Sequence, residues 1–379
     1  MSRVPILSAI LLASGTAQGQ GLGACDPSTR DGVCLHGWAE AYYAYNFAEP
    51  RGDRSSLRLH DPRHDLFSVG NVALDAAWRV GPVSGRVIAH TGMVAGTFGP
   101  VRGSDPSAPW RALQEATVAW RTPLLRGLTI DAGIWATPFS FERTAVHENW
   151  NWSASTLLAA SPYQLAGARV TVPSGAHLAL SLGVFNGWDQ VVDDASPGKT
   201  FTAAMTWRDD DFSARVLYAV GVERATGDPV GPWARHALAV SMDWRASART
   251  QLRAEVFAGY EPGRLGDGAW VGVACYGRLQ LARWLYIAAR ADALHEVRPA
   301  AVAYRAIFDP RASTLGSGTL TLDARPHDAV SLRLEYRHDL ANGPAYVSGT
   351  SAPDPLDPGV FVPDARSQDT LLLGMTAWF

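Results

Sequence analysis

The amino-acid sequence predicts an all-β protein, a transmembrane antiparallel up-and-down β-barrel of about sixteen strands with short periplasmic turns and long extracellular loops. The first observation is that apolar and polar residues alternate in segments of roughly ten residues, so each segment has one apolar and one polar face. The second is that very short turns alternate with long polar loops, as in bacterial outer-membrane barrels. The third is that the apolar faces carry no charged residue at their centres.

The N-terminus resembles an export signal, with Arg3 followed by the apolar run PILSAILLA and then small residues. We therefore expect a signal peptide over 1–19, a short periplasmic segment over 20–36 and the barrel over 37–379. An alternative is a lipoprotein cleavage box at Leu22-Gly23-Ala24-Cys25, although it lies far behind the apolar core.

Cys25 and Cys34 bracket a polar loop just before the first strand. In an oxidising compartment these two residues could form a small disulfide. No cysteine or histidine spacing suggests a metal site, and we expect neither a metal nor a cofactor.

Sixteen segments have the alternating pattern of strands, and an even number returns the chain to the side on which it entered. These segments lie near 37–47, 66–80, 85–96, 111–121, 128–139, 163–173, 177–186, 200–208, 212–223, 234–246, 250–260, 269–280, 285–296, 318–325, 330–340 and 368–379.

The segment near 330–340 shows how the faces divide. Leu332, Leu334 and Tyr336 alternate with Arg333 and Glu335. In a soluble sheet another layer would have to cover the apolar face, but no segment with a helical period is available for this. Because a charge facing lipid at mid-membrane costs about 2–4 kcal/mol, the clean apolar faces indicate contact with hydrocarbon.

Several tryptophans occur just before short turns or next to the C-terminus, and we expect them to form an aromatic girdle at one rim. They are Trp78, Trp120, Trp207, Trp244 and Trp378. The last segment is amphipathic and ends on Phe379, a pattern similar to the signal that the barrel insertion machinery reads. The expected partners are therefore this machinery, outer-membrane lipid and lipopolysaccharide.

Several stretches resemble the putative beta-barrel porin-2, or OmpL-like, family of bacterial outer-membrane proteins. They are GWAEAYYAYNFAEP at 37–50, LQEATVAW at 113–120, DAGIWATPFSFE at 131–142, ENWNWSAS at 148–155, SPYQLAGARV at 161–170 and VFNGWD at 184–189. The resemblance implies an outer-membrane barrel of the porin type. It implies no particular solute and no binding residue. This chain departs from the family pattern at Trp135, where we expect lysine or arginine.

A barrel of sixteen strands is wide enough to leave an aqueous channel. We expect a porin that lets small polar solutes diffuse across the bacterial outer membrane. Inward charges of both signs are nearly balanced, so no ion selectivity follows, and we expect most of them to pair across strands. The expected lumen-lining residues are Glu40, Asp75, Arg86, Glu115, Asp131, Arg169, Arg215, Arg253, Glu255, Arg290, Arg333 and Glu335.

The long loop near 140–162 follows the fifth segment, and in general porins the corresponding loop folds into the lumen. Aromatic and hydrogen-bonding side chains together suit a constriction for polar solutes. The alternative is a surface loop packed on itself. The candidate constriction residues are Phe141, Glu142, Arg143, His147, Glu148, Trp150 and Trp152.

Other functions receive less support from the sequence. We expect no enzyme, because there is no GxSxG or HExxH motif and no Ser/His pair at the membrane rim. The near-neutral charge gives no reason to expect nucleic acid. The main alternative is a surface adhesin or receptor barrel without an open pore, and association into a homo-oligomer is left open.

Overall fold

The computed structural model describes residues 31–97, 109–191, 196, 198–228, 230–264, 266–297, 311–357 and 359–379. The expected signal peptide and Cys25 lie outside these residues. Cys34 is disulfide-bonded, and Cys275 is a free thiol on the outer surface. The pairing of Cys34 with Cys25 stays a prediction.

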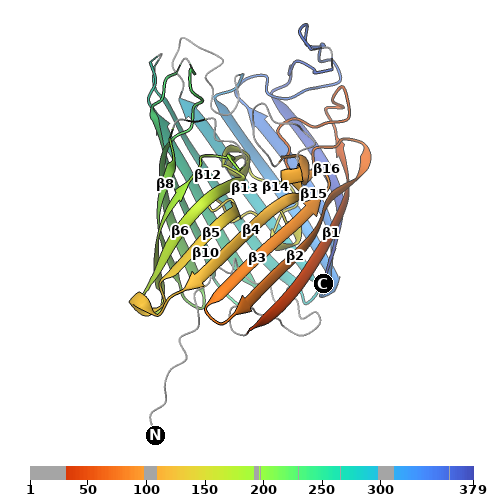
Figure 1. Ribbon diagram of the computed structural model, residues 1–379. Helices are drawn as coiled ribbons and strands as arrows, with labels where there is room; N and C mark the ends of the chain where they lie inside the picture. Colours follow the sequence, from red (N-terminus) through yellow and green to blue (C-terminus); the bar gives the residue numbers. More distant parts are fainter. Residues whose placement is uncertain are drawn as a thin grey trace.

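Sixteen antiparallel strands form one closed barrel, in which each strand pairs with its neighbours in the chain (Figure 1). The strands are β1 (Gly32–Asn46), β2 (Leu66–Val80), β3 (Val83–Thr91), β4 (Leu113–Arg121), β5 (Thr129–Ala136), β6 (Gln164–Ser174), β7 (Leu178–Phe185), β8 (Thr200–Arg208), β9 (Phe212–Val222), β10 (Ala234–Arg245), β11 (Thr250–Glu261), β12 (Gly268–Ala282), β13 (Leu285–Val297), β14 (Thr314–His327), β15 (Val330–Ala341) and β16 (Ser367–Trp378).

The barrel closes where β1 pairs with β16, with Trp38 opposite Trp378 and Asn46 opposite Thr370. Closure removes the free edge that an open sheet would expose, so every strand has two hydrogen-bonded neighbours. The sixteen-strand prediction is confirmed. Two boundaries differ by about five residues. β1 begins at Gly32 rather than near 37, and β3 ends at Thr91 rather than near 96, followed by a 3₁₀ turn over Val94–Thr97.

The outer surface is apolar along the strands. On β15, Leu332, Leu334 and Tyr336 are exposed, whereas Arg333 and Glu335 are buried inside the barrel. The alternation therefore has the direction that the sequence predicts, with lipid as the solvent of the outer face. Among the described residues, no helix is both long and apolar enough to span a membrane.

The tryptophans expected at the rim do not all face outward. Trp120, Trp207 and Trp244 are exposed on the outer surface, and the indole of Trp78 lies over Gly85 on the neighbouring strand. Trp378 is a correction, because its ring stacks on His147 inside the barrel, with centroids 4.9 Å apart. Residues alternate along β16, so Phe379 faces outward in its place.

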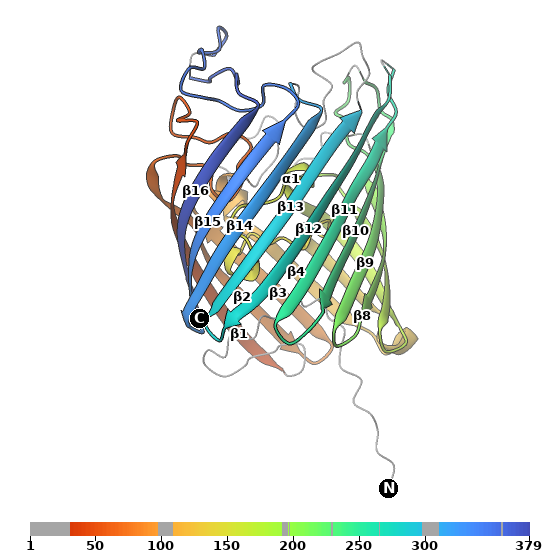
Figure 2. The same ribbon diagram turned by 180° about the vertical axis from the view of Figure 1, so that it is seen from behind.

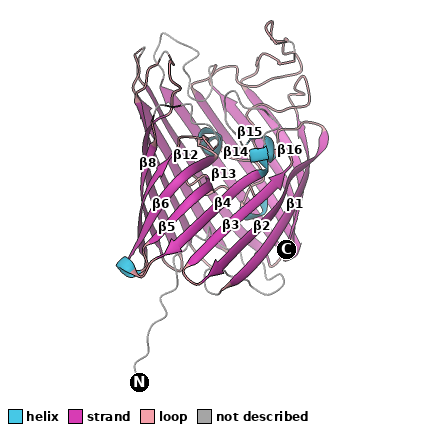
Figure 3. Cartoon of the chain, viewed as in Figure 1, coloured by secondary structure: helices cyan, strands magenta, loops and turns pink. Residues whose placement is uncertain are grey.

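Short turns gather at one end of the barrel and long loops at the other (Figures 1 and 2). The interior also holds structure, including the helix α1 (Thr156–Ala160), which contacts β12, β13 and β14 (Figures 2 and 3). This helix belongs to the segment 137–163 between β5 and β6, called loop L3 below.

Candidate pore-lining site

Loop L3 crosses the inside of the barrel. It leaves the wall at β5 and returns at β6, but its hydrogen bonds reach β1, β11, β13 and β15 on the far side of the closed sheet. Its middle includes a 3₁₀ turn over Val146–Glu148 and the short helix α1, whose N-cap Ser155 accepts a hydrogen bond from the Leu158 amide. The loop therefore occupies the lumen instead of covering the outer end of the barrel.

Three inward carboxylates hold the main chain of loop L3. Glu335 accepts hydrogen bonds from the amides of Trp152 (2.5 Å) and Ser153 (2.9 Å). Glu40 accepts one from the amide of Val146 at 2.6 Å, and Glu255 accepts one from the amide of Phe141. These bonds satisfy loop amides inside the barrel that would otherwise lack an acceptor.

Inward guanidinium groups hold the carbonyls of the same loop. Arg333 donates to the carbonyls of Asn149 (2.7 Å) and Val146 (2.9 Å). Arg290 donates to the Ser153 and Ala154 carbonyls. Arg337, which the sequence analysis did not single out, also donates to the Ala154 carbonyl.

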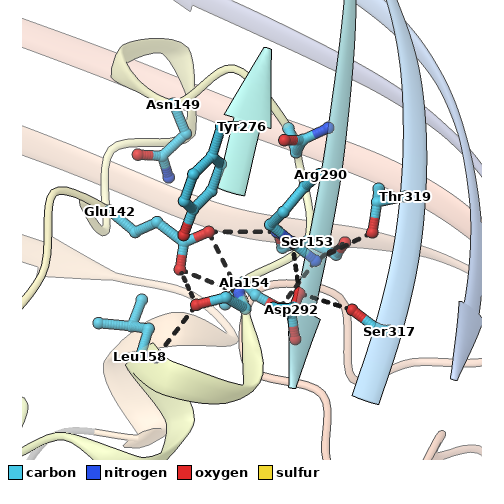
Figure 4. Close-up of polar contacts among 12 residues, drawn as sticks. Glu142, Asn149, Ser153, Ala154, Leu158, Tyr276, Arg290, Asp292, Ser317 and Thr319 are labelled. Atoms are coloured by element: carbon cyan, nitrogen blue, oxygen red, sulfur yellow. Dashed lines mark hydrogen bonds and ion pairs between the residues drawn. The ribbon is translucent and has the colours of Figure 1, made fainter. Parts of the chain in front are cut away.

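The arginine on β13 also organises side chains around loop L3 (Figure 4). Arg290 forms ion pairs with Glu142 of the loop at 3.1 Å and with Asp292 of its own strand at 2.8 Å. Asp292 in turn accepts hydrogen bonds from Ser317 (2.7 Å) and Thr156 (2.8 Å). The network is buried, and it joins the loop to two strands of the wall.

These contacts correct one expectation. Glu40, Glu255, Arg290, Arg333 and Glu335 were expected to line the lumen, but they bind loop L3 and are buried. Cross-strand pairing holds for Arg333, which lies 3.6 Å from Asp323 on β14. Alternation along a strand identifies an inward face, but it cannot show whether water or a folded loop lies against that face.

An apolar cluster inside the barrel supports the loop. Trp150 and Leu157 of loop L3 belong to one buried cluster with Phe257, Trp270 and Leu294, which face inward from β11, β12 and β13. The sequence analysis did not select these wall residues. The available signal was that large apolar side chains occupy faces expected to line water, which indicates that something covers them.

Other inward charges keep access to the lumen and pair as expected. Asp75 and Arg86 form a salt bridge between β2 and β3 at 2.7 Å, and Arg86 lies 3.8 Å from Glu115 on β4. Arg169 pairs with Asp131 on the neighbouring strand. The Arg86 side chain is 35% exposed, whereas those of Arg290 and Arg333 are fully buried. The accessible lumen therefore lies beside these arginines of β3 and β6, and we call this the open side.

The candidate constriction residues divide between this open side and the buried side. Glu142 and Trp152 are buried against the wall, and Trp152 packs on Tyr42 with ring centroids 6.0 Å apart. His147 stacks on Trp378. Phe141, Arg143 and Glu148 are only partly buried.

Arg253 links loop L3 to the open side of the lumen. Its guanidinium lies over the buried ring of Trp150 at 4.2 Å and over Phe141 at 5.5 Å, and its Nε is 2.6 Å from Asp243. A second arginine, Arg278, lies over the same Trp150 ring at 5.2 Å. Such cation–π contacts place positive charge beside the aromatic face of the loop.

Within the described residues, no group of three or more His, Cys, Asp or Glu side chains could hold a metal ion. The arrangement consists of a water-accessible half-lumen, a loop clamped to the opposite wall and charged side chains at the boundary. It has the geometry of a narrowed channel.

The model of the putative beta-barrel porin-2, OmpL-like, family matches residues 32–379. The chain belongs to this family. No curated protein matches the chain. The porin-2 family assignment agrees with the closed barrel of sixteen strands and with a location in the bacterial outer membrane.

Solved structures show the same architecture. The chain is similar to the outer membrane channel DcaP of Acinetobacter baumannii, with 12% identity, a TM-score of 0.60 and coverage of 92% of this chain and 97% of that one. It is also similar to an anion-selective porin from Comamonas acidovorans, with 12% identity, a TM-score of 0.58 and coverage of 92% and 100%. It is similar, too, to OprB of Pseudomonas putida, with 14% identity, a TM-score of 0.57 and coverage of 92% of this chain and 94% of that one. At these identities the likeness shows the fold.

Proposed function

We propose that this outer-membrane porin forms an aqueous channel for passive diffusion of small polar solutes, and that loop L3 is its constriction. The observation that carries the proposal is the division of the lumen, in which the loop covers the wall at β13 and β15 while Arg86 on β3 and Arg169 on β6 stay partly accessible. Similar barrels are described as an outer membrane channel and a porin. A barrel that only displayed loops would need no water-accessible charged half-lumen.

The residues that we assign to the constriction are those of loop L3 that border the open side. Arg143, Glu148 and Phe141 lie on the loop, with Arg253 opposite them on the wall. The narrowest point of a pore sets its selectivity, so substitutions here would change which solutes pass. Glu142, His147 and Trp152 support the loop from the buried side.

Conductance in planar lipid bilayers tests the proposal. Purified protein should give stable open channels, and replacing residues 140–162 by a short Gly-Ser linker should give larger unitary steps because the constriction is removed. A matched variant that shortens the mostly exposed segment 352–357 should keep the wild-type step. Absence of channels from the wild-type protein would favour the adhesin or receptor alternative, and equal steps from the loop L3 variant would contradict the constriction.

Association into a homo-oligomer is also a proposal. OmpT of Vibrio cholerae, 7% identical with a TM-score of 0.57, has a related structure described as a trimer form. Crosslinking in detergent, followed by mass measurement, would show whether this chain does the same.

A further inference from the structure

Most of the inward charges already bind another group of the protein. Glu335, Glu40 and Glu255 bind loop amides, and Asp75 and Asp131 bind arginines on neighbouring strands. The charges that can act on a passing solute are the ones left without a counter-charge. The near balance of inward charges in the sequence therefore does not describe the open lumen.

A recess of about 700 Å³, counting the solvent space to which it opens, lies between loop L3 and the wall of β6 to β9. Its polar lining consists of arginine, histidine and hydroxyl side chains, and no aspartate or glutamate is among the residues that line it. The lining residues are Pro138, Arg169, Thr171, His177, Ala179, Ser181, Phe185, Thr202, Ala204, Thr206, Arg208, Arg215 and Leu217.

Arg215 on β9 contributes a positive charge to this recess. Its guanidinium donates to the carbonyl of Pro138 at the start of loop L3, at 2.9 Å. Among the described residues no carboxylate lies within ion-pair distance of it, in contrast to Arg169, which pairs with Asp131. A guanidinium has five donors, so the carbonyl bond leaves donors available for a solute.

A second arginine reaches loop L3 from β12. Arg278 is hydrogen-bonded to the neutral Gln251 at 2.5 Å and lies over the Trp150 ring at 5.2 Å, and no carboxylate among the described residues forms an ion pair with it. Arg143 and Glu148 of loop L3 have opposite charges that act on each other, so this pair adds no net charge. Arg215 and Arg278 are the positive charges that remain.

We infer that this porin prefers anions and that the recess at Arg215 is a binding step for small organic anions that carry a carboxylate or phosphate group. The inference rests on the proposed pore function and specifies its substrate class. Guanidinium groups match the planar, bidentate geometry of oxyanions, and arginine side chains lining a pore favour anions. The hydroxyls of Thr171, Ser181 and Thr202 would bind the remaining polar groups of such a solute.

Reversal potentials across a KCl gradient in planar bilayers test the preference. Wild-type protein should be more permeable to chloride than to potassium. Arg215→Gln should lower the permeability ratio by at least about two-fold, since one uncompensated positive charge beside the solute path is removed. Arg215→Lys should keep most of the preference, and Arg283→Gln, on the exposed turn between β12 and β13, should leave it unchanged.

Solute competition tests the binding step. Succinate and inorganic phosphate, added in separate experiments, should reduce the chloride current of the wild-type channel more than of Arg215→Gln, and glucose should affect both equally. A greater effect of succinate would assign the recess to carboxylates, and a greater effect of phosphate would assign it to phosphate groups.

Several outcomes would overturn the inference while leaving the pore intact. They are open channels that prefer potassium, a permeability ratio that Arg215→Gln does not change, and equal inhibition of both channels by the anions. Wild-type protein that forms no channel would overturn the pore function itself. Heat-modifiable migration on gels checks that each variant has folded, and Arg215→Lys provides the folded variant in which charge is retained.

Discussion

The indole of Trp152 in loop L3 packs against Gly374 on β16. A Cβ atom placed on Gly374 would come within 2.3 Å of a ring carbon. This backbone is extended and pairs regularly with Tyr42 and Arg333, so it could accept a side chain if the indole were absent. Glycine at this position therefore serves the loop, because the small residue creates the surface on which the aromatic ring packs.

Replacing this glycine should displace the loop. Gly374→Val would push the Trp152 ring away from the wall, and we expect a changed and less steady single-channel conductance with an intact barrel. Gly318→Val is the matched control, since nothing lies within 4 Å of a Cβ there. If both variants conducted like the wild-type protein, Trp152 would not position the constriction.

The clamp at Glu335 should stabilise the docked loop. Hydrogen bonds to charged groups contribute about 1.5–3 kcal/mol each, so Glu335→Ala should weaken loop docking by a few kcal/mol. We expect frequent transitions between two conductance levels, recorded as current noise in planar bilayers. Glu115→Ala also removes an inward carboxylate, but Glu115 lies near Arg86 rather than the loop amides. Equal noise in the two variants would argue against the clamp.

The outer face should not tolerate charge. Leu334→Arg places a guanidinium in lipid, and we expect the free energy of unfolding to fall by about 2–4 kcal/mol. The inward substitution Thr206→Arg, in the recess that opens to the lumen, should cost much less. Urea titrations of the protein folded into lipid vesicles measure both values. Similar losses at the two sites would contradict the assignment of faces.

The last long loop should open at low pH. The hydroxyls of Ser351, Ser348 and Thr350 donate to Asp364 and hold its pKa below the ordinary value of 3.8. A depressed pKa means that the ionised form stabilises the loop. This stabilisation is present above pH 3.8 and is lost as the pH falls through the lowered pKa.

Amide hydrogen exchange over 345–357, corrected for the intrinsic pH dependence, should therefore accelerate below about pH 4 in the wild-type protein. Asp364→Asn, which lacks the titrating group, should exchange faster at neutral pH and show no added acceleration. A wild-type loop with constant protection down to pH 2 would contradict the role of Asp364.

Much of the architecture could be predicted from local pattern. The number of strands, most of their bounds and the facing of Leu332 and Arg333 follow from a period of two residues, because alternate side chains must meet different solvents. The error at Trp378 arose within the same pattern. Its position near the rim suggests a place in the aromatic girdle. Its alternation with Phe379, however, determines the direction of the side chain, which is inward.

By itself, the sequence determined the barrel, the outer-membrane location and the list of inward-facing charges. Only the tertiary structure decided what those charges do. Glu335 binds amides 182 and 183 residues away, and every residue other than proline carries the same amide group, so no side-chain pattern marks these partners. For the same reason, Arg215 is distinguished from Arg169 only once folding has placed a carboxylate beside one of them and not the other.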